Sequence, residues 1–298
     1  MKPNRIWIYG GITLSMVFWG LSFIGYKVAY RYFEPMALVF FRMVLASLFL
    51  YLLILLTGQS EKIHRRDWGK FLLMALFEPL LYFLGESYGM TLVSATTGSV
   101  IVSTIPLLTP IAAYILWREK ITWIKVAGII ISFAGVCMVL IGKGFELTAP
   151  PLGVALMFLA VFSAVAYTGV IVDLTRKYNS ITIILVQSFL GAIYFLPIFL
   201  LTDLKEALAM QFSWEALLPL LFLAIFPSSL SFIFYTRAIR EIGITRANVF
   251  TNFVPVFTAV FSFLILGESF TGGKIIGIPV VLAGLLLTQL RLKKKAAV

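Results

Sequence analysis

Two acidic residues, Glu78 and Glu86, lie inside a long apolar segment of the chain. If the segment is a helix, their side chains are about 80° apart around its axis and ~12 Å apart along it, with Tyr82 between them on a similar face. A carboxylate in apolar surroundings can bind a cationic group, or take up a proton and release it to water. A structural pair with Lys27, Arg42 or a backbone network is the alternative. We treat both acids as candidates for proton coupling, and Glu86 also as a candidate for substrate binding.

Polar residues with one helical spacing, i, i+4 and i+7, occur at two separate places: Ser99, Ser103 and Pro106, and Asn248, Asn252 and Pro255. Each set forms one stripe on a helix. Each also ends in a proline, which removes a backbone hydrogen bond and loosens the helix. The two serines and two asparagines are therefore candidates for contact with a polar solute. The alternative is helix packing, since such residues hold membrane helices together at about 1 kcal/mol per hydrogen bond.

Four aromatic residues complete the candidate site: Trp19, Tyr82, Tyr167 and Tyr235. A wall of mixed aromatic and polar groups suits an amphipathic organic solute, and an amine could make a cation–π contact with it. Because the chain has 27 Phe and 12 Tyr residues, packing or contact with lipid is the alternative for each of them.

The composition excludes most other kinds of chemistry. Of the 298 residues 61% are hydrophobic and only 12% are charged, with a mean hydropathy of +1.01, whereas about a quarter of a soluble domain is charged. Lipid must therefore be the solvent for much of the surface. The net charge of +11 does not indicate nucleic-acid binding, because the basic residues lie in short clusters between apolar segments. With Cys137 and His64 as its single cysteine and histidine, the chain is expected to have no disulfide, metal site or cofactor.

Ten segments are long enough to cross a membrane, which takes roughly 20 apolar residues. They span residues 6–29, 35–57, 68–89, 93–117, 121–142, 151–173, 180–202, 214–238, 244–267 and 272–291. The links between them are short, so no separate soluble domain is expected. The fold class predicted is an all-α integral membrane protein of ten transmembrane helices.

The basic residues predict how these helices are oriented. Most of the 24 Lys and Arg residues fall in the links and termini that would share one side of the membrane with the N-terminus, including Arg291, Lys293, Lys294 and Lys295. Basic residues collect on the cytoplasmic side. We therefore expect a multi-pass protein of the cell (inner) membrane with both termini in the cytoplasm.

The two halves of the chain match without a gap at an offset of 149 residues. The matched pairs include prolines, glycines and charges: Pro106 with Pro255, Glu119 with Glu268, Lys125 with Lys274, Gly128 with Gly277 and Gly135 with Gly284. We predict two repeats, 1–145 and 146–298. Five spans are an odd number, so the second repeat is inverted relative to the first. Many secondary transporters use inverted repeats, with the solute site between them near the middle of the membrane.

These features resemble the drug/metabolite transporter superfamily, and within it the EamA-type ten-helix transporters. The residues that carry the resemblance are the segment from Phe18 to Phe23, Lys27, Arg42, and the paired segments from Pro106 to Gly135 and from Pro255 to Gly284. The resemblance implies a two-repeat bundle with cytoplasmic termini and a central cavity lined mainly by spans 1, 3, 4, 6, 8 and 9. Its members move amino acids, other metabolites and cationic drugs, so it does not identify the solute.

We therefore expect a secondary transporter that exports a small organic solute: an amino acid, a metabolite, or an amphipathic or cationic drug. Its partners would be that solute and the lipid bilayer, and the driving force would be a proton gradient or the gradient of the solute itself. The sequence has no Gly-x-x-x-x-Gly-Lys-Ser/Thr loop for binding ATP. A passive channel is the first alternative, because inverted repeats also occur in channels. A membrane-embedded enzyme is disfavoured, because one His in a charged link and one Cys in an apolar segment offer little for catalysis.

Other repeated residues are assigned structural roles. Glu119 and Glu268 precede the last span of each repeat, with Thr122 and Thr271 as expected helix caps. Four glycines recur at a spacing of seven: Gly128, Gly135, Gly277 and Gly284. Such glycines allow helices to approach closely, either within one chain or between the protomers of a homodimer.

Overall fold

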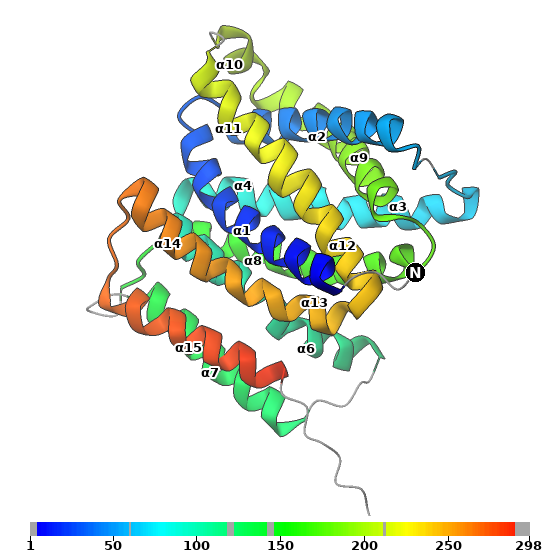
Figure 1. Cartoon of the computed structure of the whole chain (residues 1–298). Coiled ribbons are helices and arrows are strands. Elements are labelled where there is room, and N and C mark those ends of the chain that lie inside the picture. The colour runs from blue at the N-terminus through cyan, green and yellow to red at the C-terminus, as the bar shows by residue number, and fades with distance from the viewer. Residues whose placement is uncertain (1–4, 60, 118–121, 142–145, 211–212, 290–298) are drawn as a thin grey trace, which may run out of the picture.

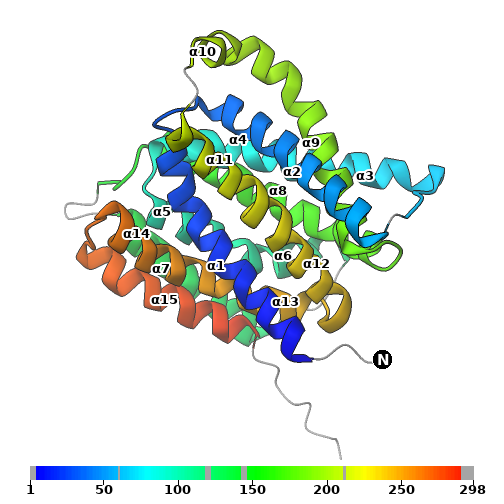
Figure 2. The same cartoon turned by 45° about the horizontal axis from the view of Figure 1, so that its top comes forward.

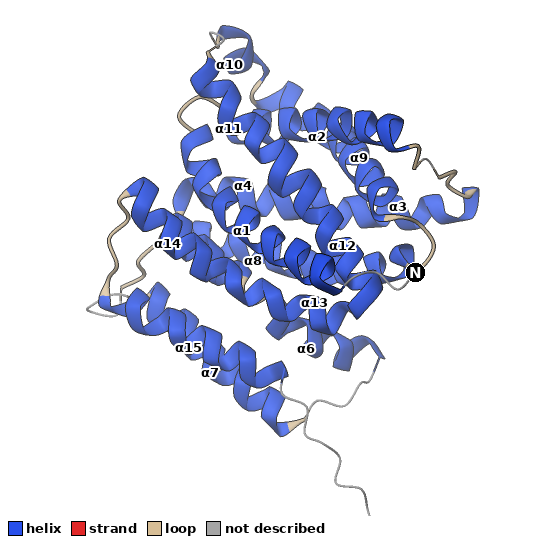
Figure 3. Cartoon of the chain, in the orientation of Figure 1, coloured by secondary structure: helices blue, strands red, loops and turns tan. Residues whose placement is uncertain are grey.

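The computed structural model describes residues 5–59, 61–117, 122–141, 146–210 and 213–289. Over these residues the chain is helical, apart from short links and one isolated bridge between Ile141 and Leu147 (Figure 3). Glu119 and the basic C-terminal cluster lie outside the described residues.

The first half of the chain contains the helices α1 (Arg5–Ala29), α2 (Pro35–Thr57), η1 (Arg65–Asp67), α3 (Trp68–Ala75), η2 (Leu76–Leu81), α4 (Tyr82–Leu92), α5 (Ala95–Val102), α6 (Ile105–Trp117) and α7 (Trp123–Leu140). The second half contains α8 (Pro151–Thr175), α9 (Ser180–Thr202), α10 (Leu204–Ala209), α11 (Trp214–Ile225), η3 (Phe226–Leu230), α12 (Ser231–Ile242), α13 (Ile244–Phe250), η4 (Thr251–Phe253), α14 (Val254–Leu266) and α15 (Gly272–Gln289).

The predicted all-helical membrane fold is confirmed. Nine helical segments among the described residues are long and apolar enough to cross a membrane, and a tenth, at residues 272–288, is apolar but shorter. The helices coincide with the predicted spans. The predicted division at residue 145 falls at the edge of an undescribed segment and stays a prediction.

Four of the spans are interrupted, including the two in which Pro106 and Pro255 were expected to loosen the helix. The third and eighth contain π-helical segments, η2 and η3, at Pro79 and Pro227. The residue before the first of these prolines, Glu78, has φ −141° and ψ 113°, the extended conformation that proline imposes on its predecessor. The fourth span breaks between α5 and α6, and the ninth at η4. In both, a proline, Pro106 or Pro255, stands in the first turn of the following helix. Backbone N–H groups in a first turn have no intrahelical acceptor, so the absence of an N–H on proline breaks no helical hydrogen bond there.

The helix contacts repeat when the two halves are exchanged (Figures 1 and 2). The bounds of α6 and α7, moved by 149 residues, are those of α14 and α15. Helix α1 contacts α11, α12 and α14, and its counterpart α8 contacts the corresponding α3, α4 and α6. Two further extensive contacts are between counterparts, α2 with α9 and α7 with α15. This is the pattern that a pseudo-two-fold axis between two five-helix halves produces.

Glycines bring α7 and α15 into direct backbone contact. A Cβ atom added to Gly284 would lie 2.4 Å from the backbone nitrogen of Ser132, and one added to Gly135 would lie 2.6 Å from that of Val281. The hydroxyl of Ser132 donates a hydrogen bond to the carbonyl of Val281 (3.1 Å). The glycine faces are thus covered within one chain, so they give no support to the alternative of packing between protomers.

We predict that Gly284→Ala lowers the stability of the protein by about 1–3 kcal/mol, because its methyl group forces α7 and α15 apart. Gly10→Ala is the matched control, since a Cβ at Gly10 meets nothing within 4 Å. The midpoint of thermal unfolding in detergent measures both. Equal midpoints for the two variants would contradict the proposed role of the glycine contact.

Candidate functional site

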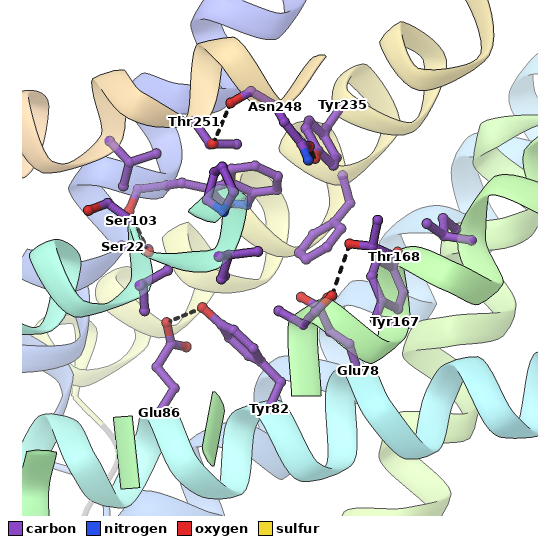
Figure 4. Close-up of a pocket in the computed structure, with 18 of the residues that line it drawn as sticks. Ser22, Glu78, Tyr82, Glu86, Ser103, Tyr167, Thr168, Tyr235, Asn248 and Thr251 are labelled. Atoms are coloured by element: carbon purple, nitrogen blue, oxygen red, sulfur yellow. Dashed lines mark hydrogen bonds between the residues drawn. The ribbon is translucent and has the colours of Figure 1, made fainter. Parts of the chain in front are cut away.

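A cavity lies between the two halves (Figure 4), with a volume of about 110 Å³. Its lining comes from α1, α2, η2 and α4, the α5–α6 break, α8, α12 and the broken helix from α13 to α14. These are spans 1, 3, 4, 6, 8 and 9, as the family resemblance implies, with Arg42 added from span 2. The lining residues are Trp19, Ser22, Phe23, Arg42, Glu78, Tyr82, Phe83, Glu86, Val102, Ser103, Ile105, Pro106, Ala164, Tyr167, Thr168, Ile171, Phe232, Tyr235, Ile244, Asn248, Thr251 and Val254.

The two carboxylates project from one side of η2 and α4, on either side of Tyr82 (Figure 4). Glu86 is only 4% exposed and accepts a hydrogen bond of 2.9 Å from the hydroxyl of Tyr82. Glu78 is only 6% exposed and lines the cavity, but no residue in the described part of the chain hydrogen-bonds or ion-pairs with its side chain. Glu86 is therefore held by the protein, whereas Glu78 offers an unpartnered group to whatever enters the cavity.

Arg42 is the basic residue of the lining, and its side chain is fixed from three sides. It is 2% exposed, donates a hydrogen bond of 2.6 Å to the hydroxyl of Tyr26 and another to that of Ser228. Its guanidinium carbon lies 4.5 Å from the ring centroid of Phe83. A side chain this deeply buried does not extend to the membrane surface, and within the described residues it forms no direct ion pair. A direct pair of Arg42 with Glu78 or Glu86, the structural alternative for these acids, is thus not formed among the described residues.

The charges of the lining do not balance. Glu78 and Glu86 are its two acids and Arg42 its one base, so with all three ionised the lining carries one excess negative charge. An uncompensated charge among buried side chains in a membrane-spanning bundle is costly. One proton or one monovalent cation restores neutrality.

The aromatic candidates all line the cavity and are themselves held in place. The indole nitrogen of Trp19 donates to the carbonyl of Pro227 (3.2 Å), and its ring packs edge-on against Tyr235. The hydroxyl of Tyr235 bonds to the side chain of Asn248, and that of Tyr167 donates to the side chain of Gln187 (3.0 Å). Gln187 was missed by the sequence analysis, although it stands at the position in α9 that Arg42 holds in α2, counted from the first residue of each helix.

Only half of the two predicted polar stripes reaches the cavity. Ser103 and Asn248 line it, but Ser99 is fully buried and its hydroxyl donates to the carbonyl of Thr96 (2.8 Å). Asn252 is also buried away from the lining, and neither atom of its amide has a hydrogen-bond partner in the described part of the chain. The prediction used one helical spacing for each stripe, and the breaks after α5 and at η4 turn these side chains away from a common face.

The cavity is not symmetric about the pseudo-axis. At the α12–α13 end it is lined by Ile244 and Asn248, close to the turn at Gly243. The counterparts of these two residues at the α4–α5 end are Ala95 and Ser99, which are buried and outside the lining. The cavity thus reaches toward the α12–α13 turn and is closed at the α4–α5 turn.

The α4–α5 end is closed by a polar cluster that joins the two halves. Glu268, between α14 and α15, pairs with Lys274 and accepts a hydrogen bond of 3.1 Å from the hydroxyl of Thr96 at the start of α5. Lys274 also donates to the hydroxyl of Ser94, the N-cap residue of α5 (3.3 Å). Burial raises the pKa of Glu268, but the hydrogen bonds from Lys274, Ser262 and Ser94 outweigh it and lower that pKa to about 2. Glu268 is therefore ionised at every physiological pH, next to a helix N-terminus, which favours negative charge.

The expected helix caps differ between the repeats. Thr271 precedes α15, and its hydroxyl accepts a hydrogen bond from the backbone nitrogen of Lys274 (3.4 Å), as predicted. Thr122 holds the N-cap position of α7, but its side chain makes no capping hydrogen bond. Among the described residues no group of three or more His, Cys, Asp or Glu side chains could hold a metal ion.

Comparisons with known proteins agree with the architecture. The model of the EamA-like transporter family matches residues 6–141 and 151–290. A protein of Archaeoglobus fulgidus named an uncharacterized transporter is 28% identical over 274 residues, which are 92% of this chain and 95% of the relative. The uncharacterized transporter YcxC of Bacillus subtilis is 24% identical over 283 residues, 93% of this chain and 90% of the relative. One crystal structure superposes with a TM-score of 0.65 at 17% identity, covering 95% of this chain and 98% of the other, and supports the fold alone.

We predict that Arg42→Lys lowers stability by about 2 kcal/mol, because an ammonium group cannot bridge Tyr26 and Ser228 while stacking on Phe83. Thermal unfolding in detergent measures the loss. Arg237→Lys, at an exposed position in the middle of α12, is the control and should leave the midpoint unchanged. Equal midpoints for wild type and Arg42→Lys would mean that the planar group is not what holds the network.

Proposed function

The chain belongs to the EamA-like transporter family, and from this premise we propose that it exports a small organic solute by alternating access between its two inverted repeats. The family and the relatives identify a membrane transporter. The solute, the direction and the coupling to protons are our proposals, and the proposed membrane is the cell (inner) membrane with both termini in the cytoplasm.

The unpartnered carboxylate of Glu78 is the observation that carries the proposed solute class. A solute with one positive charge, such as an amine, would neutralise the excess negative charge of the lining. The rings of Tyr167, Tyr235 and Trp19 lie around the same cavity and would contact its apolar part, with cation–π attraction to the charged group. A proton on Glu78 would satisfy the same balance, so solute and proton would compete for one site and transport would be coupled to the proton gradient.

The size and asymmetry of the cavity support alternating access. Its volume of about 110 Å³ is below the ~300–1,000 Å³ of pockets that enclose a drug-sized ligand, so the helices must separate for such a solute to enter. In inverted repeats, exchanging the conformations of the two halves moves the open end to the other side of the membrane. The polar cluster of Glu268 and Lys274 is then the contact that must break when the α4–α5 end opens.

Transport by purified protein in liposomes tests the role of Glu78. Uptake of labelled amino acids and of cationic dyes should depend on a pH gradient, and Glu78→Gln should reduce that uptake at least tenfold and remove the pH dependence. Glu241→Gln, on the exposed end of α12, is the control and should behave as wild type.

The same assay separates the two acids and the alternative function. Unchanged uptake and pH dependence in Glu86→Gln would exclude that residue from coupling, and the same result in Glu78→Gln would refute the proposed site. A carrier should show saturation and counterflow of a labelled solute. Uptake without either would favour the passive channel.

The role of the polar cluster can be tested by thiol labelling in detergent. We predict that Ala95→Cys, at the buried start of α5, reacts slowly with a polar maleimide in a Cys137→Ser background. Adding Glu268→Gln should raise the rate severalfold, because the charge that joins the two halves is lost. Glu241→Gln is again the control. An unchanged rate with Glu268→Gln would show that the cluster does not keep this end closed.

A further inference from the structure

Two links on one side of the bundle, outside the transport cavity, are fastened to each other. The link between α2 and α3 meets the link between α8 and α9 through Tyr178, whose hydroxyl accepts from the backbone nitrogen of His64 (3.1 Å) and donates to Asp67 (2.8 Å). The backbone nitrogen of Asn179 donates to the carboxylate of Glu61 (2.7 Å). We call the two links and the helix ends beside them, residues 61–70 and 173–179, the frame. Its hydrogen bonds hold it in place, and the distribution of basic residues predicts that it lies on the cytoplasmic side of the membrane.

The acids of this frame are occupied, whereas several of its bases are not. Asp67 forms an ion pair with Lys177 (2.6 Å), and Asp173 forms one with Lys70 (2.6 Å). The carboxylate of Glu61 accepts the hydrogen bond from the backbone nitrogen of Asn179. The exposed Lys62, Arg65, Arg66 and Arg176 have no ion-pair partner within the described residues. The frame therefore presents an excess of positive charge that the protein itself does not neutralise.

Three of these bases, Lys62, Arg65 and Arg66, line two adjoining surface hollows. One is lined by Glu61, Lys62, His64, Asp67, Lys177 and Tyr178. The other shares His64, Asp67 and Lys177 with it and adds Arg65 and Arg66. Arg side chains bind phosphate oxygens through paired N–H donors, so the second hollow fits a phosphate group.

An apolar stripe continues from the hollows along α3. Trp68 directly follows Asp67 and is 40% exposed, and Leu72, one turn further, is 44% exposed. Leu76 extends the stripe at the same spacing. Trp is typical of the boundary between headgroups and acyl chains. Helix α3 stands at the edge of the bundle beside α9 (Figure 1), where this stripe can meet lipid.

From this continuity we propose that the hollow at Arg65 and Arg66, with the stripe of α3 below it, binds the headgroup and one acyl chain of an anionic phospholipid. A free phosphate would use the bases alone, whereas the aligned Trp68 and Leu72 supply the surface that an acyl chain needs. A bound lipid would hold α3 against α9, and α3 directly precedes η2, the segment that bears Glu78. The site is independent of the proposed solute.

Native mass spectrometry of the full-length protein tests this proposal. The probes are phosphatidylglycerol, phosphatidylcholine with the same chains, and inorganic phosphate. Wild type should retain one phosphatidylglycerol at least fivefold better than phosphatidylcholine, and the double variant Arg65→Gln, Arg66→Gln should lose that preference. The control, Arg237→Gln with Arg240→Gln, removes the same charge from exposed positions on the same predicted side and should keep it.

Trp68→Ser tests the stripe while leaving every base in place, and it should weaken phosphatidylglycerol retention severalfold. Equal loss in the Arg237, Arg240 control would overturn the proposal, because the preference would then reflect net charge. Displacement of the lipid by millimolar phosphate, together with unchanged retention in Trp68→Ser, would overturn it as well, since the hollow would then be a site for soluble anions.

Discussion

The hydrogen-bonding demand of the peptide backbone is the constraint on which the rest of this structure depends. In a bilayer no water is present to satisfy a free N–H or C=O group, so a spanning segment must be helical or have its exposed backbone covered by protein or by a wet cavity. The interruptions at η2, η3 and η4 and between α5 and α6 are consistent with this rule, because each has residues buried against other helices of the bundle: Glu78, Ser228, Asn252 and Thr104. Proline creates each of them by removing a donor or by fixing its neighbour.

The candidate site exists because of these interruptions. The break at η2 gives Glu78 an extended backbone and faces its side chain to the cavity. The counterpart segment, η3, carries Ser228, which holds Arg42. The same kind of helix interruption therefore occurs twice. In the first repeat, η2 positions the carboxylate of Glu78, and in the second repeat, η3 supplies the Ser228 hydroxyl that holds Arg42. The two carboxylates, alike in the sequence, differ in the fold because only Glu86 has a partner.

The sequence predicted the helices and their pairing better than it predicted the site. Hydropathy and the offset of 149 residues were enough for the ten spans and for the matched bounds of α7 and α15. The site depends on rotations about helix axes, which periodicity cannot give once a helix is broken, and so Ser99 and Asn252 lie outside the cavity lining. Arg42 and Gln187 were underrated because their partners come from other helices, Ser228 on η3 and Tyr167 on α8.

The glycine contact between α7 and α15 has a further consequence. A Cβ on Gly128 would meet the carbonyl of Gly284, and one on Gly277 would meet that of Gly135. The two helices therefore contact each other through equivalent surfaces. An interface of this kind is self-complementary, as in a two-fold symmetric dimer. A protein made of one five-helix unit, inserted into the membrane in both directions, could assemble through the same contact. The present chain then has the form of such a pair fused head to tail, in which each copy was afterwards free to acquire residues that the other lacks.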